Sequence, residues 1–181
     1  DDNNTLSLAN NSYTDLAGNL GPDNQTANYE IDTKEPTVSS VEITSATGKQ
    51  NNFVNATDNV SVTATFSETV IVDNSSGNPT LTIVVGSDNR TATFASGDNS
   101  TALVFGYTIQ SGDNDTNGIS IGQNALDDNS STISDPAGNI PDNLTHSAVS
   151  DNSSYKVDTT APSVNSFTMN DTALKLGDNA T

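Results

Sequence analysis

The chain has 181 residues, and 23 acidic against five basic side chains give it a formal net charge of −18 at pH 7. An acidic surface of this size repels phosphate groups, so we expect neither nucleic acid binding nor direct membrane insertion. Without cysteine, and with His146 as its one histidine, the chain offers no disulfide and a poor ligand set for zinc. Its many carboxylates and amides are oxygen ligands of the kind that Ca²⁺ prefers, so Ca²⁺ is the expected cofactor.

Apolar residues recur with a period of two along most of the chain, which predicts half-buried β-strands. In chain order the pattern marks the segments 37–44, 60–66, 81–85, 90–94, 103–109, 119–121 and 155–157. Gly86-Ser-Asp-Asn89 predicts a turn between the third and the fourth segment. Seven short strands without helical periodicity predict an all-β fold, an immunoglobulin-like antiparallel β-sandwich.

Two motifs occur twice in the same order, which is the mark of an internal repeat. Asp15-Leu-Ala-Gly-Asn19 returns as Asp135-Pro-Ala-Gly-Asn139, and Tyr29-Glu-Ile-Asp-Thr33 returns as Tyr155-Lys-Val-Asp-Thr159. A proline-containing segment follows each copy of the second motif. The offset between the copies is nearly constant, so the chain is expected to consist of tandem repeats.

The repeat predicts three parts. Residues 1–31 are interpreted as the C-terminal part of a preceding repeat, 32–158 as a complete repeat, and 159–181 as the N-terminal part of a following one. One explanation is a piece of a longer array of such repeats. The other is a subunit whose incomplete ends are completed by strands from neighbouring copies.

Three segments together resemble a known class of repeat: Asp135-Pro-Ala-Gly-Asn139, Val157-Asp-Thr-Thr-Ala-Pro-Ser-Val164 and Val60-Ser-Val-Thr-Ala-Thr-Phe-Ser-Glu68. They are similar to bacterial immunoglobulin-like repeats of giant cell-surface adhesins and surface-layer proteins. The resemblance covers nearly the whole chain and is specific for the repeat class, not for a parent protein. It implies an extracellular or cell-surface extension arm, in a family where calcium often stiffens the domain junctions.

Acidic residues and asparagines at the expected junctions are candidate calcium ligands, because Ca²⁺ takes six to eight oxygen ligands from loops. The set after the complete repeat is Asp135, Asn139, Asp158 and Asp178, and the set before it is Asp15, Asn19, Asp32 and Asp58, with Glu68 beyond the strand that follows Asp58. The alternative is a plain turn, in which glycine supplies a positive φ and the Asx side chains cap backbone amides.

A third candidate lies in Asp113-Asn-Asp-Thr-Asn-Gly118, which matches the first half of an EF-hand loop through Asp113, Asp115 and Asn117. The match then fails, because position twelve is Asn124 where the motif needs glutamate, and no helices are expected beside the loop. A β-turn that could also take a cation is the favoured interpretation.

The chain has fourteen Asn-x-Ser/Thr sequons, about twice the number that its composition predicts by chance. They begin at Asn3, Asn10, Asn24, Asn55, Asn59, Asn74, Asn89, Asn99, Asn114, Asn129, Asn143, Asn152, Asn170 and Asn179. They are candidate glycosylation sites. The alternative is compositional, since turn-rich acidic β-proteins accumulate asparagine and threonine.

No catalytic constellation is expected. His146 has no nucleophile motif beside it and is expected to be a solvated or hydrogen-bonded surface residue. The expected function is a non-catalytic, calcium-stiffened spacer in adhesion, whose partners are neighbouring repeats or identical subunits and host or environmental surface ligands. The alternatives are a filament or surface-layer subunit assembled by strand complementation, and a carbohydrate- or protein-binding module that uses the loop 74–78.

Overall fold

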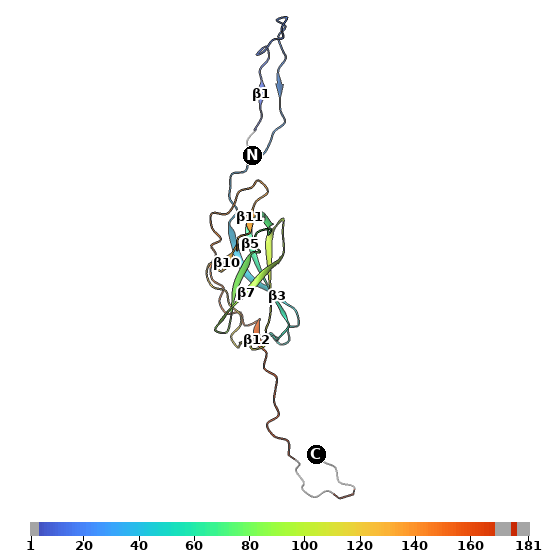
Figure 1. Ribbon diagram of the computed structural model, residues 1–181, viewed down its shortest axis with the longest axis vertical. Helices are drawn as coiled ribbons and strands as arrows, with labels where there is room; N and C mark the ends of the chain where they lie inside the picture. Colours follow the sequence, from blue (N-terminus) through green and yellow to red (C-terminus); the bar gives the residue numbers. More distant parts are fainter. Residues whose placement is uncertain (1–3, 169–174, 177–181) are drawn as a thin grey trace.

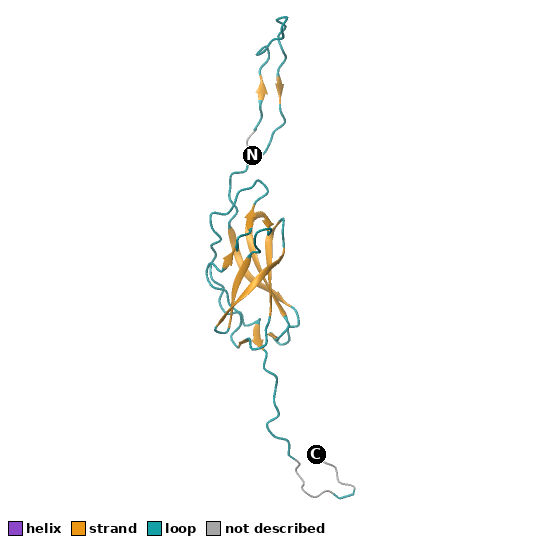
Figure 2. Ribbon diagram, viewed as in Figure 1, coloured by secondary structure: helices purple, strands orange, loops and turns teal. Residues whose placement is uncertain are grey.

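The computed structural model describes residues 4–168 and 175–176, and the regular elements in that part of the chain are all β-strands (Figure 1 and Figure 2). Among these residues there is no helix long and apolar enough to cross a membrane. The strands are β1 (Ser7–Leu8), β2 (Asn24–Gln25), β3 (Val38–Ala46), β4 (Phe53–Val54), β5 (Asn59–Asp73), β6 (Thr80–Val85), β7 (Asp88–Ser96), β8 (Ser100–Thr108), β9 (Asn114–Asp115), β10 (Leu126–Asp127), β11 (Thr132–Ser134) and β12 (Lys156–Asp158).

The fold is an all-β sandwich, as the period-two pattern predicts. Its large curled sheet has the strand order β10-β6-β7-β8-β5-β11, with β3 also paired to β5, and a small sheet has the order β4-β12-β9. The pairing is antiparallel with one exception. The strand β12 runs parallel to β4, with Lys156 opposite Phe53 and Val157 opposite Val54.

Strand β5 is the spine of the sandwich, because its first half pairs with β3 and β8 and its last residues pair with β11. Its even-numbered residues from Val60 to Phe66 are buried, in keeping with side chains that alternate across a strand. They join a single apolar core: Val41, Ile43, Val54, Val60, Val62, Ala64, Phe66, Val70, Leu81, Ile83, Val85, Ala92, Leu103, Phe105, Tyr107, Ile109, Ile119, Ile121, Leu126, Ile133 and Val157. Each large side chain buried in this way contributes about 1.5–3 kcal/mol.

Five of the expected strands are present as β3, β5, β6, β7 and β8, and the expected segment 155–157 contains most of β12. The turn after β6 is tighter than expected. Val85 pairs with Asp88, which leaves a two-residue turn whose first residue, Gly86, has a φ of 63°. The segment 119–121 forms no strand and makes only isolated bridges, from Ser120 to Val84 and from Ile121 to Val149.

Two extensions leave the sandwich at opposite ends (Figure 1). At the end that carries β11, here called the N-terminal pole, residues 32–37 connect the sandwich to a ribbon in which β1 pairs with β2. At the other end, the C-terminal pole, the chain continues beyond β12 as an extended segment without strand pairing among its described residues. The tandem organisation itself remains a prediction.

Candidate metal centre

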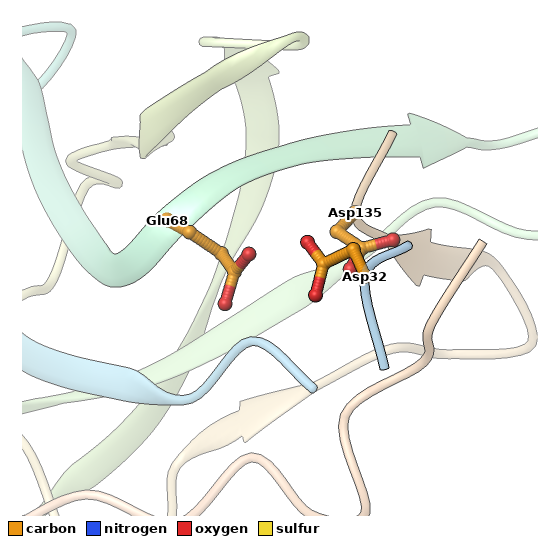
Figure 3. A group of neighbouring side chains, drawn as sticks. All are labelled: Asp32, Glu68 and Asp135. Carbon is orange, nitrogen blue, oxygen red and sulfur yellow. The ribbon is translucent and has the colours of Figure 1, made fainter. Parts of the chain in front are cut away.

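Three carboxylates converge at the N-terminal pole. Oxygen atoms of Asp32, Glu68 and Asp135 all lie within 4.8 Å of one another (Figure 3). Asp32 belongs to the segment that leads into β3, Glu68 to β5, and Asp135 to the turn after β11. This is the one group of three acidic or histidine side chains with such spacing in the part of the chain that the structure describes. Residues more than a hundred positions apart therefore meet at one point.

Glu68 is partly buried and lies in β5 between the buried residues Phe66 and Val70. The pairing of β5 with β8 is irregular over this stretch, between Thr65 and Val70. The Oε1 atom of Glu68 is buried and has no hydrogen-bond partner. A buried carboxylate oxygen without a partner is costly, since it has lost its hydration and gained nothing in return.

Asp135 is 1% exposed and is held by its own turn. Asn139 donates from its backbone N to Asp135 Oδ1 at 2.8 Å and from Nδ2 to Oδ2 at 2.7 Å. Burial works to raise the pKa of Asp135, but the hydrogen bonds from Asn139 outweigh it, and the pKa lies below its ordinary value of 3.8. This carboxyl is therefore charged at neutral pH and rigidly oriented.

Asp32 reaches the other two carboxylates because its segment is tied to the sandwich. Its backbone O accepts a hydrogen bond from Asn139 Nδ2 at 3.2 Å. Nearby, Glu35 Oε2 accepts from the backbone N of Asp142 at 3.2 Å. Three negative groups held this close repel one another, and a bound divalent cation would reverse the sign of the interaction. The donors are all oxygens, which suits Ca²⁺ or Mg²⁺ and does not suit zinc.

The grouping of ligands differs from the one expected from the sequence. Asp135 and Asp158 were expected in one set, but the turn after β11 lies at the N-terminal pole and β12 at the C-terminal pole (Figure 1). Asp135 is brought together with Asp32 instead, and with Glu68. The reason is topological. Because β11 pairs with the last residues of β5, the turn that follows β11 lies far from β12.

The remaining junction candidates stabilise turns. Asp15 accepts hydrogen bonds from Asn19 within the ribbon, and among the described residues it belongs to no cluster of three acidic or histidine side chains. Asp58 Oδ2 accepts from the backbone N of Asn55 at 2.8 Å, which closes the turn before β5. Asp158 Oδ1 accepts from the backbone N of Thr160. Asp178 lies outside the described residues.

In the EF-hand-like segment, protein donors contact the two buried carboxylates, those of Asp113 and Asp115. Asp113, 2% exposed, accepts from Arg90 Nε at 2.8 Å, from the Tyr107 hydroxyl at 2.7 Å and from the backbone N of Gln110 at 2.9 Å. Each of its oxygens therefore has a donor. These contacts give the carboxyl group a structural role in the turn, and cation binding there stays a prediction.

Asp115 and Asn117 are engaged in the same way. Asp115, 4% exposed, accepts from the backbone N of Gly86 and of Gly118 at 2.8 and 2.7 Å. Asn117 Nδ2 donates to Asp151 Oδ2 at 2.5 Å. The segment thereby joins the β6–β7 turn to the C-terminal pole: both Asp115 oxygens accept backbone hydrogen bonds, and the Asn117 side chain donates one.

Hydrogen bonding also shifts ionisation in this network. Burial works to raise the pKa of Asp113, but hydrogen bonds from Tyr107, Gln110 and Arg90 together lower it below its ordinary value of 3.8. Burial, reinforced by the hydrogen bond to Asp113, raises the pKa of Tyr107 to about 12. The network therefore favours a charged Asp113 beside a neutral Tyr107 over a wide pH range.

The same loop holds the chain where it leaves the sandwich. Thr159 Oγ1 donates to the backbone O of Asp113 at 3.0 Å and accepts from the backbone N of Gly112 at 3.0 Å. The backbone N of Thr159 donates to Asn114 Oδ1 at 3.2 Å. Sequence reasoning missed this role. The loop matches a metal-ligand motif, and its contacts with Thr159 join residues that lie far apart in the sequence.

Most sequon asparagines lie on the surface. Nine are exposed, at Asn10, Asn24, Asn55, Asn74, Asn89, Asn99, Asn114, Asn129 and Asn143. Asn59 and Asn152 are partly buried, and Asn3, Asn170 and Asn179 lie outside the described residues. Asn99 and Asn129 have φ values of 56° and 47°. Asparagine favours such turn conformations, so these two positions also fit the alternative that the sequons arise from turn-rich composition.

His146 is hydrogen-bonded as expected but buried, at 7% exposure, where a surface position was expected. Its Nε2 accepts from the backbone N of Ala125 at 2.8 Å, and Nδ1 lies 2.8 Å from the backbone O of Ser147. A ring with Nδ1 protonated satisfies both contacts. The histidine thus pins the loop before β10, and neither contact is with a nucleophile.

Comparison with protein-family models, with curated proteins and with solved structures finds no match to this chain.

Proposed function

We propose that this chain is a non-catalytic spacer of a large extracellular, cell-surface protein, stiffened by a Ca²⁺ ion that Asp32, Glu68 and Asp135 bind together. The observation that carries the cation is Glu68, whose carboxyl group faces those of Asp32 and Asp135 (Figure 3) and whose Oε1 atom is buried without a hydrogen-bond partner. A cation at this point supplies the missing partner and neutralises the repulsion. Waters and backbone oxygens would complete its coordination.

The stiffening follows from where the ligands lie. Glu68 and Asp135 belong to the sandwich, whereas Asp32 belongs to the segment between the sandwich and the ribbon. An ion shared by all three ties that segment to the N-terminal pole. The hydrogen bonds from Asn139 to Asp32 and from Asp142 to Glu35 already restrict its path, and the ion would fix it further. A spacer of this kind needs reach and rigidity, not a ligand pocket.

The recurrence of the junction motif supports an array. The backbone N of Lys34 donates to Asp32 Oδ1 at 2.9 Å, and the backbone N of Thr160 donates to Asp158 Oδ1 at the same distance. The two aspartates therefore begin the same Asx turn at opposite poles of the sandwich. We propose that Asp158 serves a following repeat as Asp32 serves this one.

Strand complementation between copies of this chain is the alternative. By the repeat register, the segments 1–31 and 159–181 correspond to the last and the first strands of a sandwich, and in this alternative they would pair with strands of neighbouring copies.

The test uses the absence of cysteine in the natural chain. Ser12→Cys in the ribbon and Ser87→Cys in the β6–β7 turn, both exposed, take spin labels for distance measurement across the N-terminal pole. With Ca²⁺ at about a hundred times its dissociation constant, we expect a narrower distance distribution than in EDTA and about 2.7 kcal/mol of added stability. For a domain of this size, that raises Tm by about 5–10 °C.

Asp32→Asn should abolish the narrowing, and Asp23→Asn, an exposed aspartate of the ribbon outside the cluster, is the matched control. If EDTA changes neither the distance distribution nor Tm, the cation is not bound and the proposal is wrong. If Asp23→Asn has the same effect as Asp32→Asn, the response is general screening of an acidic chain and not a site.

A further inference from the structure

The ribbon, residues 4–31, carries large apolar side chains that nothing covers. Leu6 is 68% exposed, Tyr13 44% and Ile31 61%, although the backbone oxygens of Leu6 and Tyr13 accept hydrogen bonds across the ribbon, from Thr26 N and Gly21 N. A two-stranded ribbon is marginal in water by itself, and a row of exposed apolar side chains on it marks an interaction surface.

The repeat assigns each of these residues a counterpart. Residues 4–19 align without a gap to 124–139, and the motif that contains Ile31 aligns to the one that contains Val157. In the sandwich the counterparts are buried: Leu126, matching Leu6, is 6% exposed, Ile133, matching Tyr13, 3%, and Val157, matching Ile31, 1%. The exposed residues of the ribbon therefore stand at core positions of a sandwich.

Other apolar residues of the ribbon have exposed counterparts. Leu20 is 60% exposed and matches Ile140, which is 57% exposed, and Leu16 matches Pro136, also exposed. The register thus separates two sets of side chains: one that the sandwich buries and one that faces solvent in both places. General hydrophobicity of the ribbon would make no such distinction.

Local geometry agrees with the register. In the ribbon, Asn19 donates to Asp15 Oδ1 and Oδ2 at 2.9 and 2.8 Å, and in the sandwich Asn139 donates to Asp135 at 2.8 and 2.7 Å. The glycine of each turn has a positive φ, 84° at Gly18 and 95° at Gly138. The ribbon thus has the turn of a closing segment, here defined as residues 124–158, but its strands β1 and β2 pair with each other, whereas β10, β11 and β12 of the closing segment pair with β6, β5 and β4.

The strands that cover the counterparts show what partner fits. Leu126 lies opposite Leu81 of β6, Ile133 opposite Val72 of β5, and Val157 opposite Val54 of β4. We infer that the ribbon is the closing segment of a second sandwich and binds a β-sheet with the apolar pattern of β4, β5 and β6. This inference rests on the repeat part of the proposed function and is independent of the cation.

The partner is a sheet that lacks a closing segment. In a second folded copy of this chain, β5 and β6 are already paired with β11 and β10, so the ribbon could bind there only by displacing them. An unoccupied sheet of the same design accepts it without displacement.

The experiment supplies such a sheet to the full chain. In an extended chain, a second copy of residues 32–123 replaces residues 1–3 and precedes Asn4, which keeps the register of the gapless alignment. Amide hydrogen exchange in EDTA is then followed for residues 4–31, whose sequence remains unique. We expect the amides around Leu6 and Tyr13 to exchange about 100-fold or more slowly than in the original chain, as core amides do.

Leu6→Asp in the extended chain should remove this protection, and Leu20→Asp should leave it intact. Exchange as fast as in the original chain would overturn the inference, as would equal effects of the two substitutions. Protection that appears in the original chain with rising concentration would also overturn it, because the partner would then be a second copy. Because the measurement is made in EDTA, its result does not depend on whether the chain binds Ca²⁺.

Discussion

Glu68 and Asp135 reach the same point from β5 and from the turn after β11, yet only Asp135 has protein donors. Asn139 binds both of its oxygens, whereas Glu68 Oε1 is buried without a partner. One carboxylate of the pair is thus satisfied by the fold and the other is not. A fold that keeps such an oxygen loses stability unless something else binds it.

Glu68→Gln tests this asymmetry, because glutamine is nearly isosteric and uncharged. In EDTA the variant should be at least as stable as the natural chain, since a buried unpaired charge has been removed. In Ca²⁺ it should lose most of the rise of about 5–10 °C in Tm that cation binding gives. Thermal unfolding in both conditions measures the crossover. Glu42→Gln, an exposed position on β3, is the control and should change neither value. Equal destabilisation in both conditions would show that Glu68 has a purely structural role.

The Asp113 network predicts a different response at the C-terminal pole. Asp113→Ala removes the acceptor of Tyr107 and of the Gln110 backbone N, which leaves a buried hydroxyl and an amide without partners. Loss of such an acceptor costs about 1–3 kcal/mol. Urea unfolding should show this loss equally in Ca²⁺ and in EDTA.

Asp88→Ala is the matched control, because Asp88 also pairs with Arg90 but its side chain is 59% exposed. Exposed ion pairs contribute little, so its stability should stay close to that of the natural chain. A calcium-dependent loss in Asp113→Ala would restore the view of this segment as a cation site.

Acid should weaken the sandwich through the same residue. The pKa of Asp113 lies below its ordinary value of 3.8, so the folded state holds the charged form more strongly than the unfolded chain does. That contribution is fully present above pH 3.8 and is lost as the pH falls through the lower folded pKa. We expect the urea midpoint to fall as the pH is lowered from about 6 to about 2, and to fall less steeply for Asp113→Asn than for the natural chain. Parallel curves would contradict the prediction.

Much of the sandwich could be predicted because the alternation in β5, β6 and β8 records local burial, and local burial is visible in sequence. Glu68 also left a signal, since it stands in phase with Phe66 and Val70 where an apolar residue is expected. Its meeting with Asp32 and Asp135 could not be predicted, because it depends on the pairing of β11 with the end of β5.

The contacts of the Asp113 segment could not be predicted either. Its spacing of oxygen ligands matches the start of a cation loop, but spacing does not reveal which donors the fold brings near. Arg90 and Tyr107 come from β7 and β8 and take up both carboxylate oxygens of Asp113. The burial of His146 was missed for the same reason, because Ala125, which donates a hydrogen bond to its ring, lies 21 residues earlier in the sequence.

Tyr107 should ionise well above the ordinary range of a tyrosine. Burial and its hydrogen bond to Asp113 raise its pKa to about 12. Because the folded pKa is raised above the ordinary value of 10.0, the stabilisation is complete below pH 10 and is lost as the pH rises through about 12. Ultraviolet titration of the phenols should therefore show a late phase that Tyr107→Phe removes.

The late phase should also depend on its neighbour. With Asp113→Asn, the negative charge beside the phenol disappears, so the late phase of Tyr107 should move to lower pH. If instead the natural chain shows no late phase, Tyr107 is not held neutral by the network. In that case the hydrogen bond to Asp113 does not order the C-terminal pole in solution, and the anchoring of Thr159 by the same loop would lose its basis.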